Sequence, residues 1–314
     1  MSDDTKTVLV SGATGSVGSQ MVKHFGDRGW CVLTAGRGVG ADVHFDLDNP
    51  EPFAATMLPS RVTLFVHAAA SNEIECRETP YRSVARNILG TKAALDFCAA
   101  NRIPQFCYVS TFHVFGRPSG VIDEDSVPAP VDDYGLSHLA AEECVCAYGR
   151  NHPWLHAFVV RPSNIYGLPI SLDGFHRWSL VQYGLCREAV TQGSITLRTS
   201  GCQLRNFIAA EDLCEIVERM ADDENRSVGL VHAAGPDTLS IRDLAGRIRD
   251  VVTAHTGKQV ELTYGSDESP SSKLQFCSRL VAPGIPQPRK HIDEFLVAFC
   301  LMLLQRRETA GEAQ

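Results

Sequence analysis

The chain has 314 residues, of which 44% are hydrophobic and 21% are charged, and its formal net charge at pH 7 is −8. This composition is typical of a globular protein, and it excludes collagen-like chains, disordered chains and disulfide-rich miniproteins. The acidic balance argues against nucleic acid and anionic membrane surfaces as partners, because both usually bind a basic face. Every apolar stretch is shorter than the roughly 20 residues of a membrane-spanning helix, so we expect no membrane partner.

The N-terminus leads directly into a strand pattern at residues 7–11 and lacks the apolar segment of a signal peptide. We therefore expect a cytoplasmic protein. The eleven cysteines occur singly, apart from Cys144 and Cys146, and no His/Cys cluster has the spacing of zinc ligands. A free cysteine in an apolar run behaves as a small core residue. We favour that interpretation over a redox or metal role, and we expect no metal site.

Short β-branched runs alternate with helical patterns through the first two-thirds of the chain. The runs are continuously apolar, as expected for strands of a parallel sheet that helices cover on both faces. This βαβ order predicts an α/β fold with a doubly wound parallel sheet. Strands are predicted at residues 8–10, 31–33, 43–47, 64–66, 106–109 and 158–160, and helices at 17–28, 79–101 and 133–151.

A glycine-rich turn separates the first strand from the first helix, with Gly12, Gly15 and Gly18 in the spacing G-x-x-G-x-x-G. Glycines there allow a tight turn and a close backbone approach, and the N-terminus of the following helix favours a pyrophosphate. The strand–turn–helix context favours a dinucleotide site over a purely structural turn. We therefore predict a Rossmann-type NAD(P)-binding domain. The residues of the turn predicted to contact the cofactor are Gly12, Thr14, Gly15, Ser16, Val17 and Gly18.

The regular alternation of strands and helices ends after Tyr166 and Gly167. We expect an NAD(P)-binding domain over residues 1–167 and a smaller C-terminal α/β substrate lobe over residues 168–314. Segments around residues 205–235 are expected to return to the first domain. In this second half, the sequence predicts a strand at 203–208, a helix at 211–221, a strand at 230–232, and loops around 168–177 and 266–288.

The end of the second strand indicates which dinucleotide is bound. An acidic residue there would hydrogen-bond the ribose 2′-hydroxyl of NAD, but the strand runs into Arg37 and the next carboxylate is Asp42. Arg37 suits the 2′-phosphate of NADP, although it is also interpretable as a solvated loop arginine. The sequence favours NADP without excluding NAD. Asp46 and Leu47, at the end of the third strand, are placed to meet the adenine.

Three segments that follow the glycine turn carry further motifs, at residues 108–116, 133–142 and 161–167. In this order they resemble the extended short-chain dehydrogenase/reductase family of the NAD-dependent epimerase/dehydratase type. Members of that family include nucleotide-sugar epimerases, dehydratases and 4-ketoreductases. The resemblance covers nearly the whole chain, and it includes the segments 66–70, 87–91 and 203–212.

In that family a Ser/Thr hydroxyl and a tyrosine bracket the reacting carbonyl or hydroxyl, while the nicotinamide exchanges hydride. The resemblance implies that Thr111 holds the substrate oxygen and that Tyr134 transfers the proton. The family's lysine, one helical turn after the tyrosine, binds the nicotinamide ribose and lowers the tyrosine pKa. This chain has His138 at that position. The matches imply cofactor contacts for Tyr134 and His138 and also for Ala68, Ala69, Ala70, Asn87 and Pro162.

Histidine in place of lysine leaves three interpretations open. With a reference pKa of about 6.5, His138 supplies a positive charge only partly near neutral pH, but its ring can still hydrogen-bond a ribose hydroxyl. The chain is then an enzyme with His138 in the lysine's role, an enzyme with other acid–base residues, or a non-catalytic NAD(P)-binding sensor or scaffold. We favour the first. Carbonyl reduction requires only that Tyr134 give a proton, so it depends less on a cation than alcohol oxidation does.

The residues after Thr111 narrow the chemistry further. The family's nucleotide-sugar dehydratases have Asp-Glu at this point, whereas this chain has Phe112 and His113. Phenylalanine cannot protonate a leaving hydroxyl, so we do not expect a dehydratase. His113 is either a further acid–base residue or a packed spacer. The sequence predicts an NAD(P)H-dependent oxidoreductase, a ketoreductase or an epimerase, acting on a small nucleotide-sugar-like or secondary-metabolite substrate.

The resemblance also implies substrate contacts. Asn164 and Arg205 would meet the substrate beside Thr111, because a guanidinium fork suits a diphosphate, although an ion pair within the lobe is an alternative for Arg205. Arg177 is interpreted as a solvated surface charge. The helices at 79–101 and 133–151 form the usual dimer interface of the family. Their apolar content permits a homodimer, and it is equally compatible with helices that only cover the sheet.

Overall fold

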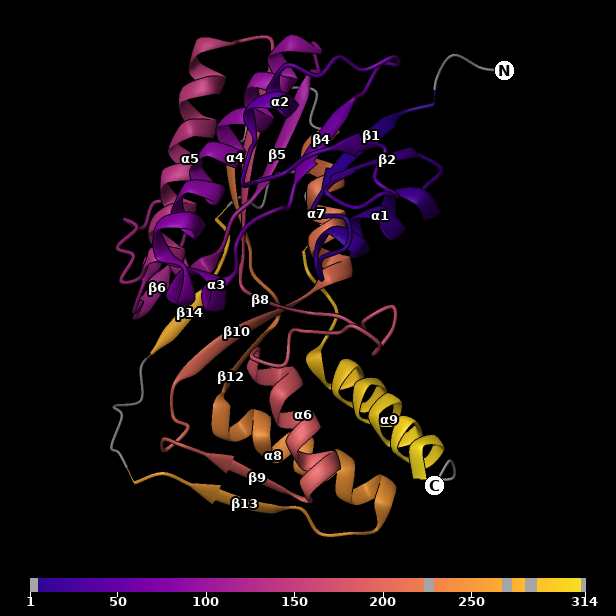
Figure 1. Cartoon of the computed structure of the whole chain (residues 1–314). Helices are drawn as coiled ribbons and strands as arrows, with labels where there is room; N and C mark the ends of the chain where they lie inside the picture. The colour runs from indigo at the N-terminus through magenta and orange to yellow at the C-terminus, as the bar shows by residue number, and fades with distance from the viewer. Residues whose placement is uncertain (1–4, 223–228, 267–272, 280–286, 312–314) are drawn as a thin grey trace.

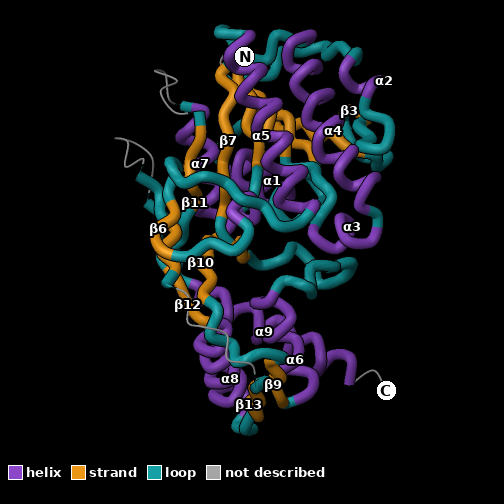
Figure 2. Tube along the Cα trace, turned by 90° about the vertical axis from the view of Figure 1, so that its left-hand side faces the viewer, coloured by secondary structure: helices purple, strands orange, loops and turns teal. Residues whose placement is uncertain are grey.

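The computed structural model describes residues 5–222, 229–266, 273–279 and 287–311. The described chain forms a large lobe built on one sheet and a smaller lobe that is mainly helical, one above the other in Figures 1 and 2. The first strand, β1 (Thr7–Ser11), belongs to the large lobe, and the last helix, α9 (Ile292–Gly311), belongs to the small one.

The large lobe is centred on a parallel sheet of seven strands in the order β11-β7-β5-β4-β1-β2-β3. The strand order reverses between β1 and β4, and ligands of open α/β sheets bind at such a point, beyond the carboxyl ends of the strands. This architecture confirms the predicted α/β fold with a Rossmann-type doubly wound sheet. The strands besides β1 are β2 (Cys31–Gly36), β3 (Val43–His44), β4 (Leu64–His67), β5 (Gln105–Val109), β7 (His156–Pro162) and β11 (Leu230–Ala233).

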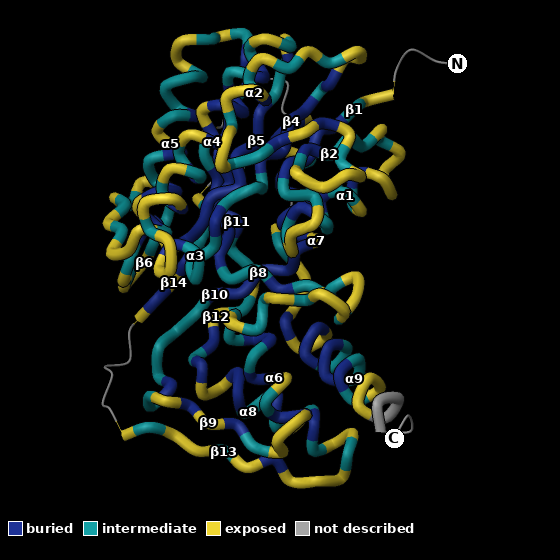
Figure 3. Tube along the Cα trace, in the orientation of Figure 1, coloured by how far each residue is buried: buried dark blue, intermediate teal, exposed yellow. Residues whose placement is uncertain are grey.

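Each face of the sheet has its own apolar core, because alternate residues of a strand point to opposite faces. Val8 and Val10 of β1 belong to the core shared with α1 and α7, whereas Leu9 belongs to the core shared with α2, α4 and α5. Figure 3 shows the strands buried between these helices. The helices of the large lobe are α1 (Gly18–Asp27), α2 (Glu51–Ala54), α3 (Glu73–Glu78), α4 (Pro80–Ala100), α5 (Asp133–Asn151) and α7 (Ala210–Ala221).

The small lobe packs α9 with two further helices, α6 (Val181–Gln192) and α8 (Ile241–Thr256), around a separate apolar core. Two short parallel strands, β9 (Ser194–Leu197) and β13 (Glu261–Tyr264), lie at its edge. No helix within the described ranges has both the length and the apolar character needed to span a membrane.

Short strands connect the two lobes (Figure 1). A three-stranded sheet has the order β12-β10-β8, and a separate pair joins β6 to β14. The sequence predicted only a loop over residues 266–288, and this was wrong for β14, whose Leu274 and Phe276 are buried against Phe112 and Phe115. Three residues are too few to show a strand period. The connecting strands are β6 (Gly120–Ile122), β8 (Asn164–Tyr166), β10 (Leu204–Ala209), β12 (Asp237–Ser240) and β14 (Leu274–Phe276).

Candidate active site

The glycine turn between β1 and α1 brings the backbone of neighbouring segments into close contact. Gly12 has φ +69°, a backbone conformation that residues with a side chain rarely adopt. A Cβ there would lie 2.8 Å from the carbonyl oxygen of Ala68. A Cβ on Gly18 would lie 2.1 Å from the carbonyl oxygen of Gly12. Within the described chain, no side chain caps the N-terminus of α1, so no side-chain acceptor opposes the positive end of the helix dipole there. The turn fits a pyrophosphate.

The other residues predicted to contact the cofactor follow neighbouring strands and meet along the carboxyl edge of the sheet. The Ala69 N–H donates to Ser11 Oγ at 3.3 Å, which holds the segment after β4 against the glycine turn. These residues are Thr14, Gly15, Ser16 and Val17 in the turn, Ala68, Ala69 and Ala70 after β4, and Pro162 at the end of β7.

Asn87, on α4, has both amide atoms engaged inside the chain. Its Oδ1 accepts from the Ser71 N–H at 2.7 Å, and its Nδ2 donates to Ser137 Oγ at 2.9 Å and to the Ser71 carbonyl oxygen at 3.4 Å. Its side chain is buried. Asn87 therefore ties the loop after β4 to α5, the helix that carries Tyr134.

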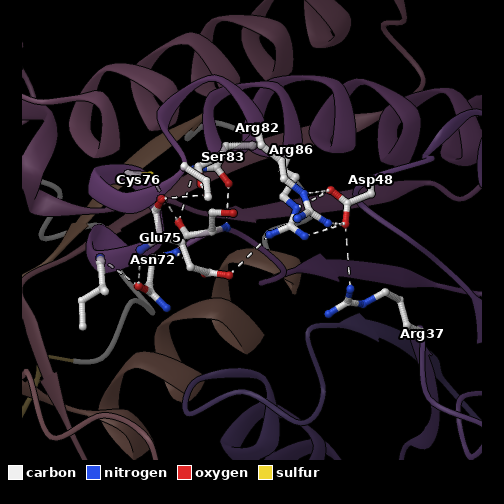
Figure 4. A network of polar contacts seen from close by, with 12 residues as sticks. Arg37, Asp48, Asn72, Glu75, Cys76, Arg82, Ser83 and Arg86 are labelled. Atoms are coloured by element: carbon white, nitrogen blue, oxygen red, sulfur yellow. Dashed lines mark hydrogen bonds and ion pairs between the residues drawn. The ribbon is translucent and has the colours of Figure 1, made fainter.

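A cluster of arginines lies beyond the ends of β2 and β3 (Figure 4). Arg82 and Arg86, from the first turns of α4, each hold the Asp48 carboxylate with two hydrogen bonds of 2.5–2.7 Å. These bonds, those from Arg82 first, hold the pKa of Asp48 well below its usual range. Arg37 lies 3.9 Å from the same carboxylate, and Arg86 also lies 3.4 Å from the Glu75 carboxylate, so three guanidinium groups share the carboxylates of Asp48 and Glu75. This cluster favours an anion.

The residues predicted to meet the adenine lie beside this arginine cluster. Asp46 accepts a hydrogen bond of 3.0 Å from the Asp48 N–H, which fixes the turn after β3. Leu47 packs on α4 so closely that a Cβ on Gly90 would lie 2.5 Å from its Cδ2. Both side chains are half-buried. Gly90 is therefore needed to make room for Leu47.

Tyr134 lies beside Thr111 and His113 because α5 approaches the short 3-10 helix η1 (Phe112–Phe115) closely. A Cβ on Gly135, the next residue, would lie 2.4 Å from the His113 carbonyl oxygen. The Tyr134 and His113 rings meet edge to face, with centroids 5.4 Å apart. Loss of water around Tyr134 raises its pKa to about 12, and contact with the Thr111 side chain opposes this shift. Tyr134 is therefore a protonated phenol at neutral pH.

His138 is buried, and it is neutral. Its Nδ1 hydrogen-bonds the Tyr108 hydroxyl at 2.8 Å, and its Nε2 is buried without a partner among the described residues. Its ring lies 4.6 Å from the Tyr134 ring, measured between centroids. Burial, together with the smaller effect of the nearby His113, lowers the pKa of His138 to about 3. The expectation that His138 supplies part of a lysine's positive charge was therefore wrong, because the ring has lost the water that stabilises its cation.

Buried polar side chains extend from His138 back across the carboxyl edge of the sheet. The rings of Tyr108 and His67 stack with centroids 5.9 Å apart, and Ser11 Oγ hydrogen-bonds His67 Nδ1 at 2.7 Å. Burial lowers the pKa of His67 to about 3 as well. Sequence reasoning missed Tyr108 and did not assign a role to His67. A tyrosine inside a continuously apolar strand was the available signal, because a buried hydroxyl needs a partner.

A buried ion pair fixes α5 against the sheet. Arg161 of β7 donates to the Glu142 carboxylate in bonds of 2.6–3.1 Å, and the Ser110 hydroxyl also donates to it. Glu142 lies two turns after Tyr134 on the same helix, so this pair sets the position of the helix that carries Tyr134 and His138. The sequence analysis did not identify this pair.

The predicted substrate residues lie on the connecting strands. Arg205 of β10 is half-buried and forms no ion pair with any described residue, and desolvation lowers its pKa. The alternative prediction for Arg205 was an ion pair within the lobe, and no such pair is present among the described residues. The Asn164 Nδ2 donates to the Asn206 carbonyl oxygen at 2.8 Å, so Asn164 holds β8 to β10.

Arg177 is not the solvated surface charge that the sequence suggested. Its guanidinium lies 3.5 Å from the Glu73 carboxylate on α3, to which the Ser179 hydroxyl also donates at 3.1 Å. The charges of Glu73 and Arg177 act on Tyr134 in opposite directions, the first raising its pKa and the second lowering it. The loop between β8 and α6 therefore reaches across to the large lobe beside Tyr134.

Sequence comparisons agree with this geometry. Residues 8–231 match the sequence model of the NAD dependent epimerase/dehydratase family. The GDP-6-deoxy-D-mannose reductase of Pseudomonas aeruginosa is 24% identical over 276 residues, which cover 84% of this chain and 84% of that protein. Two other curated relatives, from Sinorhizobium fredii and Bacillus subtilis, are matched over only 42% and 52% of their own lengths.

Solved structures share the fold. RMD from Pseudomonas aeruginosa complexed with NADPH superposes with a TM-score of 0.80 at 20% identity, covering 96% of this chain and 98% of that one. MoeE5 in complex with UDP-glucuronic acid and NAD superposes with a TM-score of 0.78 at 21% identity, covering 96% and 99%. At this identity the likeness is one of fold.

Proposed function

Because the chain belongs to the NAD dependent epimerase/dehydratase family, we propose that it is an NADPH-dependent reductase of a carbonyl group. The substrate class is a nucleotide sugar or a similar secondary metabolite with an anionic group. In this reaction the carbonyl carbon gains a hydride and the carbonyl oxygen gains a proton, so an alcohol and the oxidised dinucleotide are formed.

The observation that carries this proposal is the pairing of a protonated Tyr134 with a neutral His138. Loss of water raises the pKa of Tyr134 to about 12, and its neighbour His138 carries no charge that would lower it. A phenol in this state keeps its proton across the neutral range and so remains available as a donor, whereas the tyrosinate that would act as a base is scarce. Reduction of a carbonyl needs the proton donor, whereas oxidation of an alcohol, the first step of an epimerase, needs the tyrosinate.

The described residues fit a dinucleotide. The turn, in which Gly12 and Gly18 leave no room for a Cβ, would hold the pyrophosphate, and Asp46 and Leu47 would meet the adenine. The unpartnered Nε2 of His138 lies at the other end, where the nicotinamide ribose would bind beside Tyr134. When bound, a reduced nicotinamide supplies the hydride. Residues 68–70 and Pro162 would line the cleft between these two ends.

The arginine cluster supports NADPH over NADH. The two cofactors differ by the 2′-phosphate, and Arg37 lies at the strand end where that phosphate would bind. With Arg82 and Arg86 it forms a group of three guanidiniums that share the carboxylates of Asp48 and Glu75, which supports the binding of a further anion.

On the substrate side, Thr111 and Tyr134 would hold the reacting oxygen between them. Arg205 supports an anionic substrate, because a half-buried guanidinium without an ion pair among the described residues favours a negatively charged ligand. Asn164 would shape the cleft from β8. His113, whose ring packs on Tyr134, is a second candidate to contact the substrate.

The surfaces of α4 and α5 support a homodimer. Tyr81 and Leu89 of α4 and Leu136 of α5 are exposed large hydrophobic residues on the outside of the sheet. Exposed apolar groups of this kind on paired helices favour a partner surface, and a second copy of the chain offers the same face. Light scattering of the purified chain tests this, with a mass twice that of the chain expected.

The reductase proposal is tested by following nicotinamide absorbance with NADPH and a panel of 4-keto nucleotide sugars. We expect NADPH to be oxidised with at least one member of the panel, and NADH to serve less well. The reverse assay offers the matching alcohol with NADP, and we expect a slow rate near neutral pH. Epimerisation without net NADPH consumption would contradict the proposal, and so would NADPH binding without turnover of any carbonyl substrate.

A further inference from the structure

The buried Tyr108 hydroxyl meets the His138 ring from the side opposite its unpartnered nitrogen. We propose that Tyr108 is a positioning residue that holds His138 as a neutral ring with its proton on Nε2, so that this N–H is the donor to the nicotinamide ribose. The inference rests on the proposed function, because it requires a dinucleotide in the cleft. It also assigns to a neutral donor the ribose contact for which the family uses a lysine ammonium.

The direction of the hydrogen bond between Tyr108 and His138 fixes the tautomer. The two atoms lie 2.8 Å apart, and both side chains are almost fully buried, at 1% and 2% exposure. A phenol O–H is a stronger hydrogen-bond donor than the N–H of a neutral imidazole, so we assign the Tyr108 hydroxyl as the donor and Nδ1 as the acceptor. A neutral imidazole carries a single N–H, and when Nδ1 accepts, that N–H is on Nε2.

Of the two ring nitrogens of His138, Nδ1 is bonded to Tyr108, so Nε2 is the one that remains to hydrogen-bond a ligand. It is buried and has no hydrogen-bond partner among the described residues, although the ring centroid of Tyr134 lies 4.6 Å away. Buried N–H groups in proteins almost always have a partner. An N–H that lacks one beside the proposed proton donor, at the carboxyl edge of the sheet, indicates a ligand that is bound there.

The surroundings of His138 keep it neutral. The titratable groups that face it are His67 from β4, Tyr108 from β5, His113 from η1, and Tyr134 from its own helix. None of these is a carboxylate that would stabilise an imidazolium. The nearest buried carboxylate along the helix, Glu142, is already paired with Arg161.

Two substitutions at position 138 separate the roles of the two ring nitrogens. In His138→Gln the side-chain amide reaches the position of Nε2, whereas in His138→Asn it reaches only that of Nδ1. We expect His138→Gln to bind NADPH within about three-fold of the wild type and His138→Asn to bind about ten-fold more weakly. Dissociation constants come from the fluorescence of bound NADPH, without any substrate.

Removal of the Tyr108 hydroxyl tests the positioning role. We expect Tyr108→Phe to weaken NADPH binding by about five-fold, because one hydrogen bond no longer holds the ring. Tyr148→Phe is the matched control. Tyr148 lies on α5, the helix that also carries His138, and its hydroxyl donates to Asp96 at a place remote from the proposed cofactor site. We expect no change in NADPH affinity when this hydroxyl is removed.

Nitrogen NMR of histidine-labelled protein gives a reading that a purely structural role would not change. The His138 signals are identified by their loss in His138→Gln. We expect Nε2 to be protonated and Nδ1 unprotonated from about pH 6 to about pH 9, and we expect both tautomers in Tyr108→Phe. The inference would be overturned if the wild-type ring carried its proton on Nδ1 or were an imidazolium at neutral pH. Equal NADPH affinity of the Gln and Asn variants would also overturn it. Failure of the wild type to bind either dinucleotide would instead overturn the proposed function.

Discussion

The two ends of the proposed cofactor cleft differ in burial and therefore in charge. At the adenosine end, Arg37 and Arg82 are 65% and 58% exposed and gather with Arg86 around Asp48. At the nicotinamide end, Tyr108 and His138 are 1% and 2% exposed and carry no charge. Water stabilises the guanidinium groups of Arg37 and Arg82 at the first end, where the more buried Arg86 is paired with Asp48 and Glu75, and the absence of water removes the charge of the imidazole at the second.

This difference shows how one cleft separates recognition from chemistry. Under our proposal, the charged groups in contact with water bind the cofactor phosphate, and this binding weakens as salt is added. Neutral groups without water hold a proton until a substrate takes it. The surroundings set the charge of both Asp48 and His138. Neighbouring arginines keep Asp48 ionised, whereas burial keeps His138 neutral.

The largest expected effect is that of Tyr134→Phe, which removes the proton donor at the neutral end. We expect the rate of NADPH oxidation to fall by about 10²- to 10⁴-fold, the usual contribution of a positioned acid. NADPH affinity should stay close to that of the wild type, since the ring remains. Steady-state rates and fluorescence titration measure the two quantities. Full activity in Tyr134→Phe would mean that another group gives the proton, with His113 the first candidate.

His138→Lys would remove the difference between the two ends by adding a cation beside Tyr134. The pKa of Tyr134, about 12 in the wild type, should then fall by roughly 1–3 units. Alcohol oxidation needs the tyrosinate, so its rate rises as pH approaches that pKa, and in the variant this rise should begin at lower pH. Initial rates of the reverse reaction across the alkaline range give the profile. An unchanged profile would show that charge at position 138 does not act on Tyr134.

Arg37→Ala tests the charged end. We expect NADPH to bind about ten-fold more weakly and NADH to bind as before, because only NADPH carries the 2′-phosphate. Competition titrations with the two dinucleotides provide the measurement. Arg249→Ala is a suitable control, since Arg249 is an exposed arginine on α8 in the small lobe. If the preference between NADPH and NADH stays the same, Arg37 is a solvated loop residue.

The smallest effect is expected on stability. Asp48→Asn should lower the free energy of unfolding by roughly 1 kcal/mol near neutral pH, because solvent weakens its bonds to Arg82, which is 58% exposed, more than those to Arg86, which is 13% exposed. The folded-state pKa of Asp48 is depressed, so its contribution is complete above its unfolded pKa of about 3.9 and is lost as pH falls below that value. The difference in the free energy of unfolding between the wild type and Asp48→Asn, measured with urea, should therefore be smaller at acidic pH than at neutral pH. A constant difference would exclude the carboxylate as its cause.

Elements that depend on local pattern were predicted well. The helix predicted at residues 133–151 is α5 (Asp133–Asn151), and the helix predicted at 79–101 is α4 (Pro80–Ala100). Apolar periodicity sets the span of each helix. The glycine turn lies where the motif placed it, because backbone contacts at Gly12 and Gly18 admit no side chain. The third strand, predicted at residues 43–47, is shorter than predicted and ends at His44.

Interactions between distant residues were not predicted. Tyr108 and His138 are 30 positions apart, Asp48 and Arg82 are 34 apart, and Glu73 and Arg177 are 104 apart. No local period or spacing connects such pairs. They arise when the sheet edge and the two lobes bring them together. The sequence therefore identified His138 as the unusual residue, but its charge depended on burial that only the folded chain provides.

The pH dependence of the forward reaction tests the central claim most directly. The claim is that Tyr134 gives the proton beside a His138 that stays neutral. With saturating NADPH and a reducible carbonyl substrate, we predict a constant rate from about pH 6 to about pH 9, because neither group titrates in that range. A rate that falls with an inflection near the ordinary histidine pKa of about 6.5, and loses that inflection in His138→Gln, would contradict it.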